Sequence, residues 1–301
     1  MSEEKINDNK KQGILCIISA AFFFALMNLF IREAGDLPTY EKAFFRNIVA
    51  VFVSGGTLLF GKKGFKIGNG NLKYLFGRAA FGTIGLFCNF YAIDKLDISD
   101  ASMLNKLSPF FSMIFSIWVL REKPKAKEWL IVAVAFIGAL FVVRPSFDVT
   151  RLPALIGLIG GATAGLAYTF VRKLGGRGEP GSNIVFFFSC FSCLVSLPIM
   201  VAGYVPMSGH QLLMLLLCGA SATGGQYSIT MAYQKAPAKE ISVFDYTQVI
   251  FAAILGYLFL GQIADKYSYI GYVIIIAAAI WKWIENNRKD KGSKNGITRK
   301  T

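Results

Sequence analysis

Long apolar runs separated by short polar segments alternate along the whole chain. The runs reach the ~20 residues that an α-helix needs to cross a bilayer, and they lack the alternating polarity and ~10-residue length of β-barrel strands. We therefore predict an all-α integral membrane protein with ten transmembrane helices. The predicted spans are residues 13–31, 40–60, 72–93, 98–120, 127–143, 153–171, 182–203, 210–233, 239–260 and 268–285.

The second half of the chain repeats the first half at an offset of 140 residues, without a gap. Each copy holds five predicted spans, and an odd number places the second copy in the opposite orientation, a plan common among secondary transporters. We predict two inverted five-helix repeats over 13–143 and 153–285, with 1–12 and 286–301 as cytoplasmic tails. Among the matches, Leu26, Phe30, Arg32 and Gly35 recur as Leu166, Phe170, Arg172 and Gly175.

The charged residues are few and segregated. Hydrophobic residues make up 54% of the 301 positions and charged residues only 17%, which is less charge than a soluble domain carries. Although the net charge is +14, most of the 32 Lys and Arg lie in alternate predicted loops and in the two tails. This asymmetry follows the positive-inside rule. We therefore expect a multi-pass protein of the cytoplasmic membrane with both termini in the cytoplasm and no nucleic-acid partner.

Five short motifs stand in the third and fourth predicted spans: Gly77 to Gly85, Tyr91-Ala92-Ile93, Asp100-Ala101-Ser102, Leu107-Ser108-Pro109 and Leu120-Arg121-Glu122. This set resembles the EamA family of the drug/metabolite transporter superfamily. Both halves are similar to EamA units, although Gln262 stands where the second half would match Glu122. The resemblance implies a ten-helix inverted-repeat fold around a central cavity and the transport of small metabolites. The run from Gly77 is similar to that of members that handle carboxylates or S-adenosylmethionine-like compounds.

Charged side chains within the predicted spans mark candidate binding positions, because each is costly in a bilayer unless it is paired or faces water. Arg46 and Arg78 lie in the second and third spans, and Lys106 and Asp245 lie deeper, in the fourth and ninth. Three cations and one anion favour an anionic or zwitterionic ligand. The two arginines are suited to a carboxylate and Lys106 to a point contact, while Asp245 is suited to an ammonium group or a proton.

The repeat aligns Asn105-Lys106 with Asp245-Tyr246. Equivalent positions of inverted copies converge near the membrane midplane, where transporter substrates bind. We therefore add Asn105 and Tyr246 to the candidate substrate-binding residues.

Structural roles are the alternative for these charges. Arg46 and Arg78 lie near predicted helix ends, from which long side chains snorkel to the surface, and Glu41 is close enough in sequence to neutralise Arg46. Lys106 and Asp245 also suit a structural ion pair between the fourth and ninth spans. The sequence alone leaves both alternatives open.

Uncharged polar and aromatic residues complete the candidate substrate-binding set. A cavity for an organic solute is mostly apolar with a few placed polar groups. The same side chains also suit hydrogen bonds between helices, worth roughly 0.6–2 kcal/mol each. The members are Asn28, its repeat counterpart Tyr168, Asn89, Tyr91, Gln226, Tyr227 and Gln248.

Glycine and proline positions predict where helices approach closely or bend. Gly157, Gly161 and Gly165 fall on one face of the sixth span at four-residue spacing, which favours close helix packing. Pro109 removes a backbone hydrogen bond in the fourth span and predicts a kink. Because Val249 stands at the equivalent place in the second copy, we expect the kink to be asymmetric.

Together these patterns predict a secondary active transporter that moves a small polar or amphipathic metabolite, such as an amino acid or related carboxylate, by alternating access. The alternative is a structural or channel-like membrane protein. An enzyme is disfavoured because the only histidine, His210, lies near a span end and no catalytic motif occurs. Expected partners are membrane lipids and the small-molecule substrate, with protons as the candidate coupling ion. We expect no cofactor, and no metal at Cys190 and Cys193, which lack other ligands.

Overall fold

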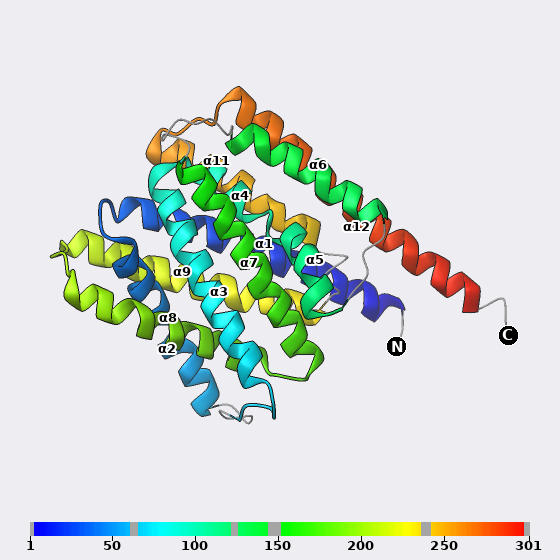
Figure 1. Cartoon of the computed structure of the whole chain (residues 1–301), viewed down its shortest axis with the longest axis horizontal. Helices are drawn as coiled ribbons and strands as arrows, with labels where there is room; N and C mark the ends of the chain where they lie inside the picture. The colour runs from blue at the N-terminus through cyan, green and yellow to red at the C-terminus, as the bar shows by residue number, and fades with distance from the viewer. Residues whose placement is uncertain (1–2, 61–65, 122–125, 144–151, 236–241, 298–301) are drawn as a thin grey trace.

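A computed structural model describes residues 3–60, 66–121, 126–143, 152–235 and 242–297, and all secondary structure within these ranges is helical (Figure 1). In chain order the elements are α1 (Glu3–Glu33), α2 (Thr39–Phe60), α3 (Leu72–Lys95), α4 (Ile98–Asn105), α5 (Ser108–Val119), α6 (Ala126–Val143), α7 (Leu152–Gly176), α8 (Gly181–Ala202), α9 (Gly209–Lys235), the 3₁₀ helix η2 (Ser242–Tyr246), α11 (Thr247–Leu260) and α12 (Lys266–Ile297).

Six of the described helices are long and apolar enough to cross a membrane, namely α1, α2, α7, α8, α9 and α12. Apolar helices at 129–142 and 244–260 are shorter. The helix α3 is long enough, but Arg78 and Asn89 lower its apolar character. These helices confirm an all-α chain that passes the membrane several times, while the number ten stays a prediction.

The helices α2 and α8 are counterparts in the two halves, and they pack side by side in opposite directions. Near one end of the pair, Gly55 faces the Phe186 ring. Near the other end, the Tyr40 hydroxyl donates a hydrogen bond to the Gly203 carbonyl at 2.7 Å. Antiparallel packing of counterpart helices is the arrangement that an inverted repeat requires.

The counterparts α6 and α12 also pack antiparallel, and Figure 1 places this pair along one edge of the molecule. Gly138 of α6 faces Ile275, and Gly271 of α12 faces Val142, so that small residues let the two helices approach closely. None of the residues described as lining the central cavity below belongs to this pair.

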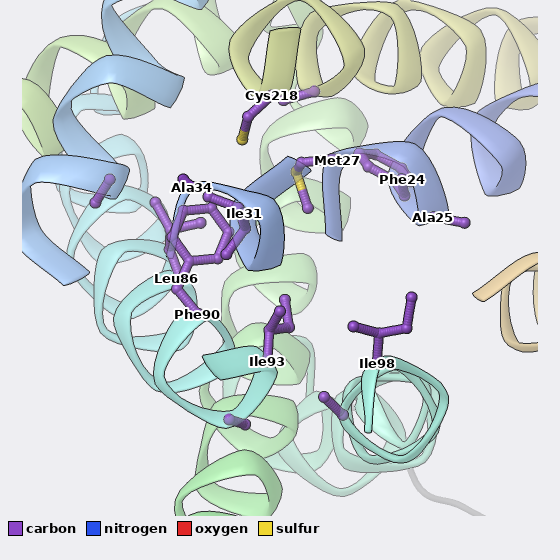
Figure 2. Close-up of a cluster of buried hydrophobic side chains, with 14 of the residues drawn as sticks. Phe24, Ala25, Met27, Ile31, Ala34, Leu86, Phe90, Ile93, Ile98 and Cys218 are labelled. Carbon is purple, nitrogen blue, oxygen red and sulfur yellow. The ribbon is translucent and has the colours of Figure 1, made fainter. Parts of the chain in front are cut away.

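Two further helix pairs also join the first half to the second half: α1 packs along α9, and α3 packs along α7. Apolar side chains of α1, α3, α4 and α9 form one buried cluster between them, which includes Ile31, Phe90, Ile98 and Cys218 (Figure 2). Burial of such side chains fixes the helix positions from which polar groups reach the cavity.

The fourth predicted span is interrupted, because Lys106-Leu107 separates α4 from α5. At the equivalent place of the ninth span the 3₁₀ helix η2 passes into α11 at Tyr246-Thr247 with no residue between them. The two copies therefore differ here, and the asymmetric kink stays a prediction. Pro109 lies in the first turn of α5, where its missing N–H costs nothing, so proline suits the start of the new helix.

Several predictions fall on residues that the structure does not describe. They include the loop between the two repeats with Arg144 and Pro145, and the Glu122 position. At the chain ends, α1 and α12 continue as helices into the predicted tails, to Glu3 and to Ile297. The repeat and tail boundaries stay predictions.

Candidate central cavity

A polar cavity of about 100 Å³ lies between helices from both halves. Apolar walls come from Phe24, Met27 and Leu86, and none of the described lining residues is acidic. Nine of the thirteen sequence-predicted candidates line it: Asn28, Arg46, Arg78, Asn89, Asn105, Lys106, Tyr168, Gln226 and Gln248.

Arg46 of α2 and Arg78 of α3 are the main cationic groups of the cavity. They are only 4% and 7% exposed, so neither snorkels to the surface. Glu41 does not neutralise Arg46, because its Oε1 accepts a hydrogen bond from the Val205 N–H at 2.7 Å. In the described part of the chain neither guanidinium forms a salt bridge, and each Nε lacks a hydrogen-bond partner.

A single aromatic ring stands beside both guanidinium groups. Cζ of Arg78 lies 4.2 Å from the Phe188 ring centroid, and Cζ of Arg46 lies 5.6 Å from it. Both distances are within the range of a cation–π interaction, which offsets part of the desolvation of the charges. Phe188 is itself buried on α8 and lines the cavity. Sequence reasoning missed it, because an apolar residue in an apolar span carries no signal of its own.

Lys106, between α4 and α5, and Asp245, in η2, form an ion pair between the two halves. The Lys106 Nζ lies 2.6 Å from Asp245 Oδ2, and both side chains are largely buried. The Tyr246 hydroxyl donates a hydrogen bond to the Lys106 carbonyl at 3.0 Å. This carbonyl is not used by the N–H of Phe110, which bonds to Leu107 instead. The break thus frees the acceptor that Tyr246 uses.

Four predicted residues lie outside the set that lines this cavity. Asp245 and Tyr246 both bond to Lys106, which is itself a lining residue. Tyr91 lies two positions from Asn89, and a rotation of about 200° on the helix turns it away. Tyr227 accepts or donates a hydrogen bond with Thr57 at 3.0 Å and lines a second cavity.

The second cavity has a volume of about 510 Å³ and lies between α2, α9 and the start of α8. Gln226 lines both cavities, so they meet at this side chain. The second cavity is bordered by the segment from Gly178 to Ser182. Basic residues that precede this segment, Arg172, Lys173 and Arg177, belong to a loop that the sequence predicts to be cytoplasmic.

The Glu179 carboxylate ties the α7–α8 connection to the residues before α3. It accepts hydrogen bonds from Gly68 N–H at 3.0 Å, from Asn71 Nδ2 at 2.7 Å and from Asn183 Nδ2 at 3.0 Å. Burial opposes ionisation, but these three bonds to the charged form outweigh it, so the pKa of Glu179 falls below its ordinary value of 4.5.

Opposite this connection, the first turn of α2 binds two other helices. Lys42 is fully buried, and its Nζ lies 2.5 Å from Asp94 Oδ1 of α3. The neighbouring Tyr40 and Glu41 bond to the end of α8 and to Val205. These contacts lie at the end of α2 that is away from Glu179.

The described residues contain no group of three or more His, Cys, Asp or Glu that is placed to hold a metal ion. Hydrogen-bond donors on arginine, lysine, asparagine and glutamine dominate the cavity instead. Such a set of donors in a largely apolar surround can hold an anionic group of an organic solute.

Comparison with known proteins relates the whole chain to membrane transporters. The sequence profile of the EamA-like transporter family matches twice, over residues 11–144 and 151–282. The pseudopaline exporter CntI of Pseudomonas aeruginosa is 33% identical over 277 residues, which are 91% of this chain and 96% of that protein. The S-adenosylmethionine uptake transporter of Rickettsia prowazekii is 24% identical over 264 residues, 86% of this chain and 87% of that protein.

A solved crystal structure supports the same fold. It matches with a TM-score of 0.64 over 90% of this chain and 96% of that protein, at 14% sequence identity. At this identity the likeness concerns the arrangement of helices alone.

Proposed function

We propose that this chain, which belongs to the EamA-like transporter family, is a secondary active transporter that moves a small anionic or zwitterionic metabolite across the cytoplasmic membrane. The observation that carries the proposal is the pair of buried guanidinium groups, Arg46 and Arg78, in a cavity without a described acidic lining residue. A buried cation without a counter-anion is costly, and a carboxylate bound between the two arginines offsets that cost.

The proposed transport cycle is alternating access. The central cavity of about 100 Å³ is smaller than the roughly 300–1,000 Å³ typical of sites for organic ligands, so binding requires the helices to separate. The larger cavity that shares Gln226 supplies the path on the predicted cytoplasmic side. The contacts of Lys42 with Asp94 supply the closure on the other side.

Asp245 is the proposed proton acceptor. Its Oδ2 pairs with Lys106, while its buried Oδ1 has no hydrogen-bond partner. Protonation of this carboxylate weakens the ion pair between the α4–α5 connection and η2, which links proton binding to helix movement. The pseudopaline exporter and the S-adenosylmethionine uptake transporter differ by name in direction, so the proposal names none.

Two experiments test the function. A thermal-shift panel of amino acids, dicarboxylates and their amides identifies ligands, because a ligand stabilises the state that it binds. Flux of the best ligand into proteoliposomes is then measured with and without a pH gradient. We expect acids to bind, flux to saturate and to be accelerated by ligand on the opposite side, and Asp245→Asn to lose the pH response.

Other results would contradict specific parts of this proposal. A ligand set made only of neutral or cationic compounds would contradict the substrate class. Flux that neither saturates nor responds to ligand on the opposite side would favour a channel-like protein. An Asp245→Asn variant with the wild-type pH response would remove the proton role.

A further inference from the structure

Gly82, one turn after Arg78 on α3, leaves the space that the Arg78 guanidinium occupies. A Cβ atom at Gly82 would overlap Nη1 of Arg78 and would lie 3.0 Å from Cε2 of Phe188. The Phe188 ring also lies against the guanidinium, with its centroid 4.2 Å from Cζ. The charged group is therefore packed both against the bare α3 backbone at Gly82 and against an aromatic ring of α8.

Close helix packing does not account for Gly82, unlike its neighbour Gly85. A Cβ at Gly85 would meet backbone atoms of α7, at Ala164 N and Gly160 O, both 3.2 Å away. The three atoms nearest to a Cβ at Gly82 belong only to the side chains of Arg78 and Phe188. The space at Gly82 thus serves the arginine and not the approach of another backbone.

The internal repeat provides an independent comparison. The residues of the second half that correspond to Arg78 and Gly82 are Cys218 and Ala222. Both are fully buried, so the equivalent place accepts a methyl group where no arginine has to fit. The glycine accompanies the arginine in one copy, and both are replaced in the other.

The clamped guanidinium has free bonding capacity. Nε of Arg78 is buried without a hydrogen-bond partner, and Arg78 lines the central cavity. A planar guanidinium stacked on a ring keeps its N–H groups at its edge, where they match the two oxygens of a carboxylate. Because stacking limits rotation of the side chain, less entropy is lost when the ligand binds.

We propose that Gly82 and Phe188 are positioning residues that clamp Arg78 with its N–H edge toward the cavity, and that this clamp makes the transporter select substrates by a carboxylate group. The inference rests on the proposed function, in which Arg78 faces the substrate. Alanine at Gly82 displaces a flexible side-chain end and not a backbone, so the fold is retained while the guanidinium moves.

The test compares each acid in a metabolite panel with its amide, by competition for flux in proteoliposomes of the full chain. We expect Gly82→Ala to reduce the preference for the acid about tenfold, equivalent to ~1.4 kcal/mol, with amide affinity unchanged. Arg78→Gln should lose the same preference. The double variant Arg78→Gln/Gly82→Ala should lose no more than Arg78→Gln alone, because both changes remove one interaction.

Gly77→Ala, on the same helix as Gly82, is the matched control. Its Cβ would lie 2.9 Å from the Phe170 ring of α7 and would not touch Arg78. It should keep the acid preference. Phe188→Leu removes the ring and keeps an apolar side chain, so it should also reduce the preference for the acid. This variant tests the clamp if Gly82→Ala does not fold. Wild-type acid preference in Gly82→Ala, together with its loss in Arg78→Gln, would overturn the clamp and leave the proposed function standing. Wild-type acid preference in Arg78→Gln would overturn both the clamp and the proposed function.

Discussion

The Nζ of Lys106 lies 2.6 Å from Oδ2 of Asp245, and this ion pair joins the interruption between α4 and α5 to the end of η2. The two residues are neighbours in the repeat alignment, since Lys106 corresponds to Tyr246 and Asp245 corresponds to Asn105. This contact between the two halves therefore combines an ion pair with the hydrogen bond from Tyr246 to the Lys106 carbonyl. Lys106 also lines the cavity, so the structural and cavity-lining roles coincide in one side chain.

Removal of one partner of this pair should destabilise the protein strongly. Lys106→Met leaves Asp245, which is 15% exposed, without its cation, and the free energy of unfolding should fall by about 3–5 kcal/mol. Lys106→Met/Asp245→Asn should recover most of the loss, since no uncompensated charge remains. Thermal unfolding of the purified variants measures the loss of stability in the single variant and its recovery in the double variant.

The exposed pair of Lys127 and Glu285 is the control for that comparison. Its atoms are 3.7 Å apart, and Lys127 is 71% exposed, so Lys127→Met should leave the melting temperature nearly unchanged. A double variant at Lys106 and Asp245 that is no more stable than Lys106→Met would contradict the account of this ion pair.

Substitution of Gly165 should disrupt the packing of α7 on α5. A Cβ there would lie 2.6 Å from Phe111 Cβ, 2.7 Å from Ser108 O and 2.9 Å from Ser112 N, so mostly fixed atoms would have to move. Gly165→Ala should lower the free energy of unfolding by about 1–3 kcal/mol or more. Gly175→Ala on the same helix meets nothing within 4 Å and should be neutral or stabilising, as Ala favours helix. Equal melting temperatures of the two variants would count against close packing at Gly165.

Acid should weaken the contact that Glu179 makes with Asn71, Asn183 and Gly68. The pKa of Glu179 is lower in the folded protein than its ordinary value of 4.5, so its contribution to stability is complete above that value. This contribution is lost as the pH falls through the lower folded pKa. The melting temperatures of wild type and Glu179→Gln should therefore differ at neutral pH and converge in strong acid. A difference that stays constant across this range would show that the charge of Glu179 is not what the hydrogen bonds stabilise.

The sequence predicted the helices well, because the length of each apolar run and the 140-residue repeat are both read directly from the order of the residues. The family resemblance on the Gly77 to Leu120 motifs is confirmed by the profile match. The interruption at Lys106-Leu107, two residues before Pro109, lies close to the predicted kink. The 3₁₀ turn η2 before α11 escaped prediction, since no residue of Ser242–Tyr246 signals that type of helix.

The sequence identified the charged cavity residues because charge within an apolar span is conspicuous. It could not identify Phe188 and Gly82, which matter through the space and the surface that they give to Arg78. It also missed the pairing of Lys42 with Asp94, because an ion pair between residues 52 positions apart depends on how α2 and α3 pack. Pairing between elements is a property of the fold and not of the local pattern.

The most direct test of the central claim is the flux of a carboxylate substrate and of its amide into proteoliposomes that contain wild type, Arg46→Gln or Arg78→Gln. Both substitutions keep a polar side chain, shorter than that of arginine, and remove the charge. The account predicts that each variant stays folded, loses transport of the acid by at least about tenfold, or ~1.4 kcal/mol, and transports the amide as wild type does. Unchanged transport of the acid in both variants would contradict the claim that these two arginines bind the substrate.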